Sequence, residues 1–390
     1  MVSDRLKGIK SSATLEITAK AKMLKAKGID VIGFGAGEPD FDTPREIKTA
    51  LYEAVADGFV YYTPPAGIME LREEITEKLD KDNNLRYNPE TQIIVTPGAK
   101  QALYEAIMAI VNPGDEVLIP EPWWVSYVPM VQLAGGKPVF IPTTEEKKFQ
   151  LEAKTIKKGI SKKTKAIILN SPNNPTGAVI NAYDLKEIAE LCKENNLIAI
   201  SDEIYEHLTY GARHHSVASF KDMKERTITI NGFSKAYSMT GWRLGYAAGP
   251  EDIIKAMTKL QAHSISNATS FVQKAGVAAL QSAQRSIKEM VTEFKKRRDT
   301  VVKMLNDIPD ISCIKPQGAF YAFPNFSKYM KDSFKLTDYL LTEANVAVVP
   351  GKAFGEGGEG FIRISYATSM DNLIKGIERI EGALKKLRKS

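Results

Sequence analysis

Strands and helices alternate through the middle of this 390-residue chain, and the alternation limits the fold more than any other feature. Short runs of apolar and β-branched residues predict seven strands, at 93–96, 116–119, 138–142, 165–169, 197–201, 227–230 and 244–248. Helical periodicity separates most of them, at 101–111, 125–134, 182–195 and 252–261. Repeated strand–helix units build mostly parallel sheets covered by helices on both faces. The sequence therefore predicts an α/β fold around a mostly parallel, seven-stranded sheet.

The last third of the chain has a different pattern. Strands are expected at 312–315, 320–323, 346–349 and 361–365, with helices at 336–344 and 372–386. This mixture predicts a second, smaller α+β domain. Near the other end, helices are expected at 19–27 and 44–57, with a strand at 31–35 between them. A chain of this length is sufficient for two domains with a large core.

Composition excludes several classes of protein. The formal net charge of +6 is spread along the chain among acidic residues, so we expect no nucleic-acid partner. The two cysteines do not form a disulfide scaffold and are typical of a reducing compartment. No run reaches membrane-spanning length, and the first residues lack the apolar core of a signal peptide. The expectation is a cytoplasmic enzyme without a membrane partner.

A small loop between the strands at 227–230 and 244–248 combines a potential nucleophile with potential phosphate-binding residues. It contains Lys235 next to Ser234, and Arg243 follows eight residues later. Gly232 and Gly241 permit close backbone approach. A lone lysine in a loop is usually solvated, but here a hydroxyl and a planar guanidinium suited to phosphate accompany it. An amine nucleophile beside a phosphate anchor is what a covalently held pyridoxal phosphate requires.

Residues 234–246 read Ser-Lys-Ala-Tyr-Ser-Met-Thr-Gly-Trp-Arg-Leu-Gly-Tyr. This run resembles the lysine signature of the class I pyridoxal-phosphate aminotransferases, and similar motifs follow in family order along nearly the whole chain. The resemblance implies the fold type I architecture of these transferases. It also implies a homodimer with shared active sites. Residues 1–40 are then an arm that joins the small domain, 41–285 the large cofactor-binding domain and 286–390 the small domain.

The resemblance also assigns roles to residues. Lys235, Asp202 and Tyr205 are implied as catalytic, and the cofactor is pyridoxal 5′-phosphate. The implied cofactor-binding residues are Gly98, Ala99, Lys100, Trp124, Asn174, Asp202, Tyr205, Ser234, Lys235, Arg243 and Tyr62 of the partner subunit. The implied substrate-binding residues are Gly37, Trp124, Asn174, Arg363, Lys100, Ser12 and Thr14. Many family members carry serine where this chain has Gly232, which puts one phosphate contact in doubt.

Several of these positions make physical sense on their own. Asp202 ends an apolar strand, and a buried carboxylate needs a partner, which the pyridinium nitrogen of the cofactor would supply. Arg363 lies in the apolar run Phe-Ile-Arg-Ile-Ser, where a guanidinium is costly without an anion such as a substrate carboxylate. The turn at 97–100 opens a helix, and a helix N-terminus is a ready anion site.

Two other sites were considered and rejected. Gly33, Gly35 and Gly37 do not have the G-x-G-x-x-G spacing of a dinucleotide-binding loop. A metal site would draw on Asp202, Glu203, Glu206, His207, His214 and His215. These residues lack a regular ligand spacing, so no metal is expected.

Substrate choice depends on a second cation, because all amino acids share the group that Arg363 would bind. Lys100, with Ser12 and Thr14, resembles the bacterial and archaeal subgroup that uses aspartate and 2-oxoglutarate. Aromatic or neutral amino acids stay open, as does prephenate, for which Lys10 is available. A carbon–sulfur lyase with the same cofactor is an alternative reaction. A regulator with an aminotransferase-like domain is the non-enzyme alternative, but residues 1–35 are too short for an added DNA-binding segment.

Overall fold

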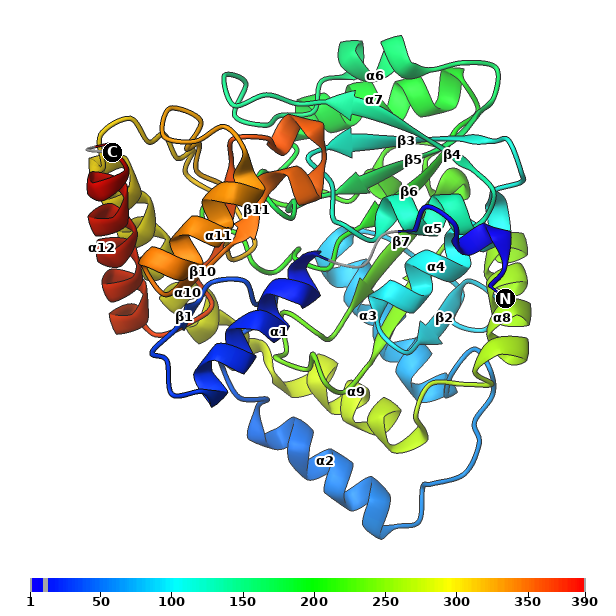
Figure 1. The fold of residues 1–390 in the computed structure, drawn as a ribbon. Coiled ribbons are helices and arrows are strands. Elements are labelled where there is room, and N and C mark those ends of the chain that lie inside the picture. Colours follow the sequence, from blue (N-terminus) through cyan, green and yellow to red (C-terminus); the bar gives the residue numbers. More distant parts are fainter. Residues whose placement is uncertain (1, 10–12, 389–390) are drawn as a thin grey trace.

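A seven-stranded sheet forms the centre of the computed structural model, which describes residues 2–9 and 13–388, without the side chains of residues 13–15 and 18 (Figure 1). The strand order is β2-β8-β7-β6-β5-β3-β4. All pairs are parallel except those of β8 with β2 and β7. The strands are β2 (Ile93–Thr96), β3 (Glu116–Glu121), β4 (Lys137–Pro142), β5 (Thr164–Asn170), β6 (Ile198–Asp202), β7 (Thr227–Gly232) and β8 (Gly245–Ala248). The predicted mostly parallel sheet is confirmed.

Both faces of this sheet are covered, and successive residues of a strand alternate between them. In β5, Ala166 and Ile168 pack with α4, α5 and α8, whereas Ile167 and Leu169 pack with α6 and α7. A third cluster joins β2 and β8 to α3 and α9, and α2 packs on α9. These helices are α2 (Arg45–Ala56), α3 (Met69–Asn83), α4 (Ala99–Ile110), α5 (Tyr127–Leu133), α6 (Ala153–Gly159), α7 (Ala182–Glu194), α8 (Glu251–Ser264) and α9 (Ser270–Ser282).

The C-terminal part of the chain forms two small sheets with flanking helices (Figure 1). One is antiparallel, in the order β11-β12-β9, and the other pairs β1 with β10 in parallel. The strands are β1 (Ile32–Gly33), β9 (Tyr321–Ala322), β10 (Val346–Ala347), β11 (Val349–Pro350) and β12 (Ile362–Ser365). The helices are α1 (Ala13–Ala26), α10 (Gln284–Asp307), α11 (Ser333–Glu343) and α12 (Met370–Leu387). Because β1 pairs with β10, the N-terminal segment packs on this C-terminal part.

Some local predictions were wrong. The strand expected at 312–315 is a single bridge from Ser312 to Asn325. The strand expected at 346–349 is divided into β10 and β11, which belong to different sheets. The helix expected at 125–134 is shorter at both ends, since α5 spans Tyr127–Leu133. Among the helices of the described residues, none combines the length and the apolar character needed to cross a membrane.

Candidate active site

A cavity of about 370 Å³ lies where the carboxyl ends of several parallel strands meet. Many of the residues proposed from sequence line it: Gly37, Ala99, Lys100, Trp124, Asn174, Asp202, Tyr205, Ser234, Lys235, Arg243 and Arg363. Residues that sequence reasoning missed also line it, among them Tyr127 and Tyr321. The sheet therefore brings together residues that lie far apart in the sequence, from Gly37 to Arg363.

Lys235 follows β7 and its amine lies inside this cavity. Its Nζ donates a hydrogen bond of 2.5 Å to the carbonyl oxygen of Gly37. Burial disfavours the ammonium form and lowers the pKa of Lys235 to about 8, with Arg363 and Arg243 adding positive charge nearby. An amine with such a pKa has a much larger neutral fraction near physiological pH than an ordinary lysine, and a neutral amine is both a nucleophile and a base.

Asp202 ends β6 with a buried carboxylate. The hydroxyl of Tyr127 donates to Asp202 Oδ2 at 2.6 Å, and the backbone N–H of Ile204 donates to Oδ1 at 3.3 Å. Burial raises the pKa of Asp202 to about 6, while the Tyr127 hydrogen bond opposes that rise. A cationic group bound in the cavity would stabilise the ionised form further. Tyr127 was missed because an aromatic residue close to two tryptophans is more often core packing.

An anion site lies at the start of α4. Gly98 has a φ of 89°, and a Cβ there would lie 2.5 Å from a guanidinium nitrogen of Arg243. The guanidinium also donates to the carbonyl oxygens of Thr240 and Pro97. Gly98 does not line the cavity itself; its lack of a side chain makes room for Arg243. The N-terminus of α4, the guanidinium and Ser234 together suit a phosphate.

Gly232 occupies the position where many members of the resembling family have serine. An added Cβ there would lie 2.8 Å from Gly245 Cα and 3.0 Å from the carbonyl oxygen of Leu244. Because these neighbours are backbone atoms, a serine side chain would require the sheet to shift. The missing phosphate contact therefore follows from close strand packing in this chain.

Arg363 has a charged side chain but no acidic partner among the described residues. It is only 2% exposed. Its Nη1 donates to Asn174 Oδ1 at 3.0 Å and its Nη2 to the carbonyl oxygen of Gly35 at 2.8 Å, while Nε has no partner. The guanidinium stacks 4.4 Å from the ring centre of Tyr321. A buried cation with spare donors is suited to a carboxylate ligand.

Tyr321 also joins Arg363 to Tyr205. The hydroxyls of Tyr205 and Tyr321 lie 2.9 Å apart, and either can donate. Tyr205 is fully enclosed, and burial raises its pKa well above the usual value. The phenol of Tyr205 is therefore a neutral donor, as a role toward a cofactor oxygen requires.

Lys100 lies at the rim of the cavity, with its Nζ 4.9 Å from the ring centre of Trp124. Burial and the nearby charge of Arg243 lower its pKa. Ser12 and Lys10 fall outside the described residues, and so does the side chain of Thr14. The structure therefore describes one of the residues proposed to recognise a second carboxylate.

Tyr62 does not lie in the cavity of its own chain, and it is 89% exposed. It borders a separate surface hollow with Val60, Ile265 and Asn267, among others. The segment 265–270 thus lies beside Tyr62.

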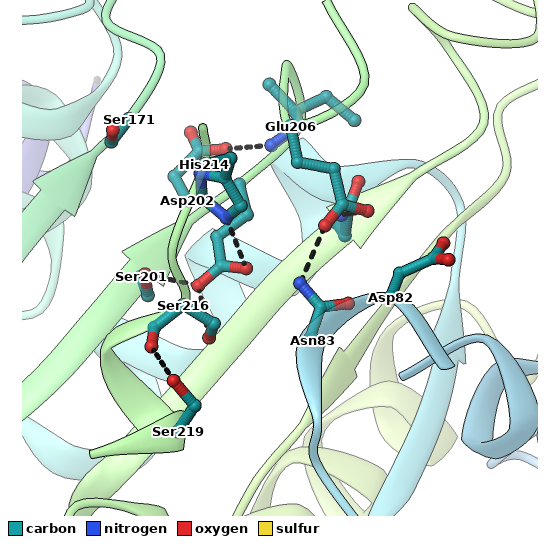
Figure 2. A network of polar contacts seen from close by, with 12 residues as sticks. Asp82, Asn83, Ser171, Ser201, Asp202, Glu206, His214, Ser216 and Ser219 are labelled. Carbon is teal, nitrogen blue, oxygen red and sulfur yellow. Dashed lines mark hydrogen bonds and ion pairs between the residues drawn. The ribbon is translucent and has the colours of Figure 1, made fainter. Parts of the chain in front are cut away.

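The rejected metal set is partly gathered in space. Glu203, Glu206 and His214 place ligand atoms within 4.8 Å of one another, despite their irregular spacing. However, the amine of Lys78 pairs with Glu206 and supplies the cation there. Figure 2 shows Glu206 and His214 in a polar network next to Asp202.

Comparison with known proteins gives a consistent result. Residues 29–380 match the family described as aminotransferase class I and II. A probable aspartate/prephenate aminotransferase from Aquifex aeolicus is 50% identical, over 99% of both chains. The aspartate aminotransferase of Bacillus subtilis is 48% identical, again over 99% of both chains. A solved structure of Thermus thermophilus aspartate aminotransferase with maleate has a TM-score of 0.95 and 42% identity, and covers 98% of this chain and 99% of that one.

Proposed function

Because this chain belongs to the class I and II aminotransferases, we propose that it transfers the amino group of L-aspartate to a 2-oxo acid, with 2-oxoglutarate as the acceptor. The observation that carries the substrate class is a pair of cations in one cavity, the buried Arg363 and the rim residue Lys100. Two cations match the two carboxylates of aspartate. The names of its relatives, aspartate and aspartate/prephenate aminotransferases, support the same class.

The cofactor of this family is pyridoxal 5′-phosphate, and the residues of the cavity fit it. The start of α4, with Ala99, suits the phosphate together with Ser234 and Arg243. Asp202 supplies a buried carboxylate for the ring nitrogen, and the Tyr127 hydroxyl orients it at 2.6 Å. Tyr205 and Asn174 supply donors for the ring oxygen, and Trp124 supplies an aromatic surface.

The reaction needs an amine that can exchange and then move a proton. When bound, pyridoxal phosphate supplies an electron-accepting ring that stabilises charge at the substrate Cα. Lys235 would hold the cofactor through Nζ. Its amine, partly neutral because burial lowers its pKa to about 8, would take the substrate Cα proton once it is free. Asp202 holds its negative charge against the ring nitrogen throughout.

The substrate is oriented by its two ends. Arg363 binds the α-carboxylate through the donors that now point to Asn174 and the Gly35 carbonyl. The backbone N–H of Gly37 would donate to the same α-carboxylate. The carbonyl oxygen of Gly37 accepts a hydrogen bond from Lys235 Nζ. We assign the distal carboxylate to Lys100, with Ser12 and Thr14 completing that end of the site.

A homodimer is part of the proposal. The surface hollow beside Tyr62 exposes three further large apolar side chains, Val60, Tyr61 and Ile265. Exposed apolar side chains gathered in this way are typical of a protein–protein interface. A second copy placed there would carry Tyr62 toward the neighbouring phosphate site. The division at residues 40 and 285 and a cytoplasmic location also remain proposals; the two free, buried cysteines agree with the latter.

The test is an amino-donor screen with purified, cofactor-saturated protein. We expect aspartate and 2-oxoglutarate to give oxaloacetate and glutamate, at a kcat/KM above those of neutral and aromatic amino acids. Prephenate is assayed as a second acceptor. Formation of a keto acid without any acceptor would instead indicate a carbon–sulfur lyase.

A further inference from the structure

The segment 202–206 has two sides with different chemistry. Asp202 and Tyr205 line the cavity, whereas Glu203 and Glu206 do not. Both Glu203 and Glu206 are buried, and Figure 2 shows Glu206 in a polar network with Asn83. The reaction as described makes no use of this network. Buried charge is costly, so the network calls for an explanation.

Glu203 ties its segment to the chain that follows. Its Oε1 accepts from the hydroxyls of Ser201 at 2.8 Å and Ser216 at 2.7 Å. Its Oε2 lies 3.1 Å from Nε2 of His214. Ser201, His214 and Ser216 all lie close to Glu203 in the sequence, so the contacts of Glu203 are local.

Glu206 reaches much further. It pairs with the amine of Lys78, and its Oε2 accepts from the side-chain amide of Asn83 at 2.8 Å, both near the end of α3. Its Oε1 also accepts from the side chain of Asn231 at 2.6 Å, at the end of β7. One carboxylate thus joins three separate parts of the chain.

The contact with Asn231 leads to the lysine loop. Asn231 Oδ1 accepts the backbone N–H of Gly232, the last residue of β7 and three residues before Lys235. The backbone N–H of Glu206 is held by the carbonyl oxygen of Glu203. Glu206 is therefore linked on one side to the turn that carries Tyr205, and on the other to the loop that carries Lys235.

The ion pair of Glu206 and Lys78 keeps the network charged and in place. Burial alone would raise the pKa of Glu206, but the charge and hydrogen bond of Lys78, together with the charges of His207 and His214, outweigh burial and hold this pKa well below the usual range. The side chains of Lys78 and Glu206 are only 6% and 5% exposed. The amine of Lys78 lies against Glu206 and supplies positive charge to this network.

We propose that Glu206, held by Lys78, is a positioning residue for the aminotransferase reaction. It sets the place of Asp202 and Tyr205 relative to Lys235, and so aligns the cofactor ring with the base. The inference rests on the proposed roles of these three residues. Misplacement of a reacting group by about 1 Å can cost on the order of a hundredfold in rate.

Two sets of variants separate positioning from stability. Glu206→Leu removes the main carboxylate partner of the buried Lys78, whose other carboxylate, Asp82, lies 3.9 Å away, and should lower Tm strongly. Lys78→Met/Glu206→Leu removes both charges and should recover most of the Tm. Asn231→Ala breaks only the link to the lysine loop and leaves the ion pair intact. The matched control is Lys274→Met/Glu70→Leu, which removes the more exposed ion pair between α9 and the same helix α3.

The readouts are kcat and KM for aspartate and the pH titration of the visible absorption of the bound cofactor. In the double variant and in Asn231→Ala, we expect kcat to fall by about tenfold to a hundredfold. KM should change little, and the absorption midpoint should move. The control should match the wild type in all three. Wild-type kcat and an unmoved absorption midpoint in both the recovered double variant and Asn231→Ala would overturn the inference. The absorption titration needs no substrate, so it tests positioning even if aspartate proves to be the wrong donor.

Discussion

The hydroxyl of Tyr127 lies 2.6 Å from Oδ2 of Asp202 and donates to it, so the carboxylate at the end of β6 is oriented by a side chain from the start of α5. This hydrogen bond favours the ionised form and opposes the effect of burial on the pKa of Asp202. Tyr127 thus belongs to the active site, although it lies 75 residues away in the sequence.

Tyr127→Phe should therefore raise the pKa of Asp202 above about 6. The carboxylate would then protonate at higher pH, so the acidic limb of the kcat/KM profile should move upward. A lost hydrogen bond to a charged group predicts a decrease in kcat/KM of about tenfold or more. Tyr339→Phe, which removes a tyrosine bond to the Ala383 carbonyl far from the cavity, is the control. An unmoved acidic limb would contradict the role of Tyr127.

The pKa of Lys235 predicts how cofactor uptake depends on pH. Only the neutral amine can attack the cofactor, and burial lowers this pKa to about 8. We expect visible absorbance to appear after pyridoxal phosphate is added to the apoprotein. The initial rate at which this absorbance increases should rise with pH through 8 and then level off. Lys235→Ala should give no such absorbance and almost no turnover. An ordinary lysine, with a pKa of about 10.4, would keep the rate rising beyond pH 9, and that result would contradict the assignment.

We propose that Lys100 decides the substrate. Lys100→Ser should reduce kcat/KM for aspartate by about tenfold to a hundredfold, since a hydrogen bond to a charged group contributes roughly 1.5–3 kcal/mol. Alanine and phenylalanine, which lack the distal carboxylate, serve as internal controls and should change little under cofactor saturation. An equal loss for all three amino acids would mean that Lys100 serves the phosphate or the fold.

Subunit exchange tests the role of Tyr62. Chains carrying Lys235→Ala are mixed with chains carrying Tyr62→Phe, and hybrid dimers form. If Tyr62 serves the neighbouring site, one site per hybrid carries both defects and the other carries neither. Wild-type phosphate affinity should then return in a fraction of sites, measured by cofactor titration. Verified exchange without recovery would place Tyr62 in the site of its own chain.

Sequence patterns predicted the central sheet because its strands are buried on both faces and therefore read as apolar runs. The elements near Ser312 and Val349 were less predictable, since very short strands at the edges of small sheets carry too few residues for a periodic signal. Helix α3 was not predicted, and its importance appears only through Lys78 and Asn83.

The same division applies to the site. Residues within recognisable motifs, such as Lys235 and Arg363, were predicted and lie in the cavity. Tyr127 and Tyr321 were missed because a buried tyrosine in a sequence does not reveal its hydrogen-bond partner. A buried phenol does require a hydrogen-bond partner. The sequence therefore indicated that a partner exists, and only the fold shows which residue it is.

The pairing of the antiparallel strand β8 determines where new chain termini can be introduced by circular permutation. Gly245, at its start, is paired with Thr96 of β2 and with Gly232 of β7. The loops that carry Ala99, Lys235 and Arg243 therefore leave the sheet at one point, and their spacing is set by strand register rather than by continuity of the backbone. A circular permutant with new termini in a distant surface loop would preserve this three-strand register. It would therefore keep Ala99, Lys235 and Arg243 in place around the cofactor.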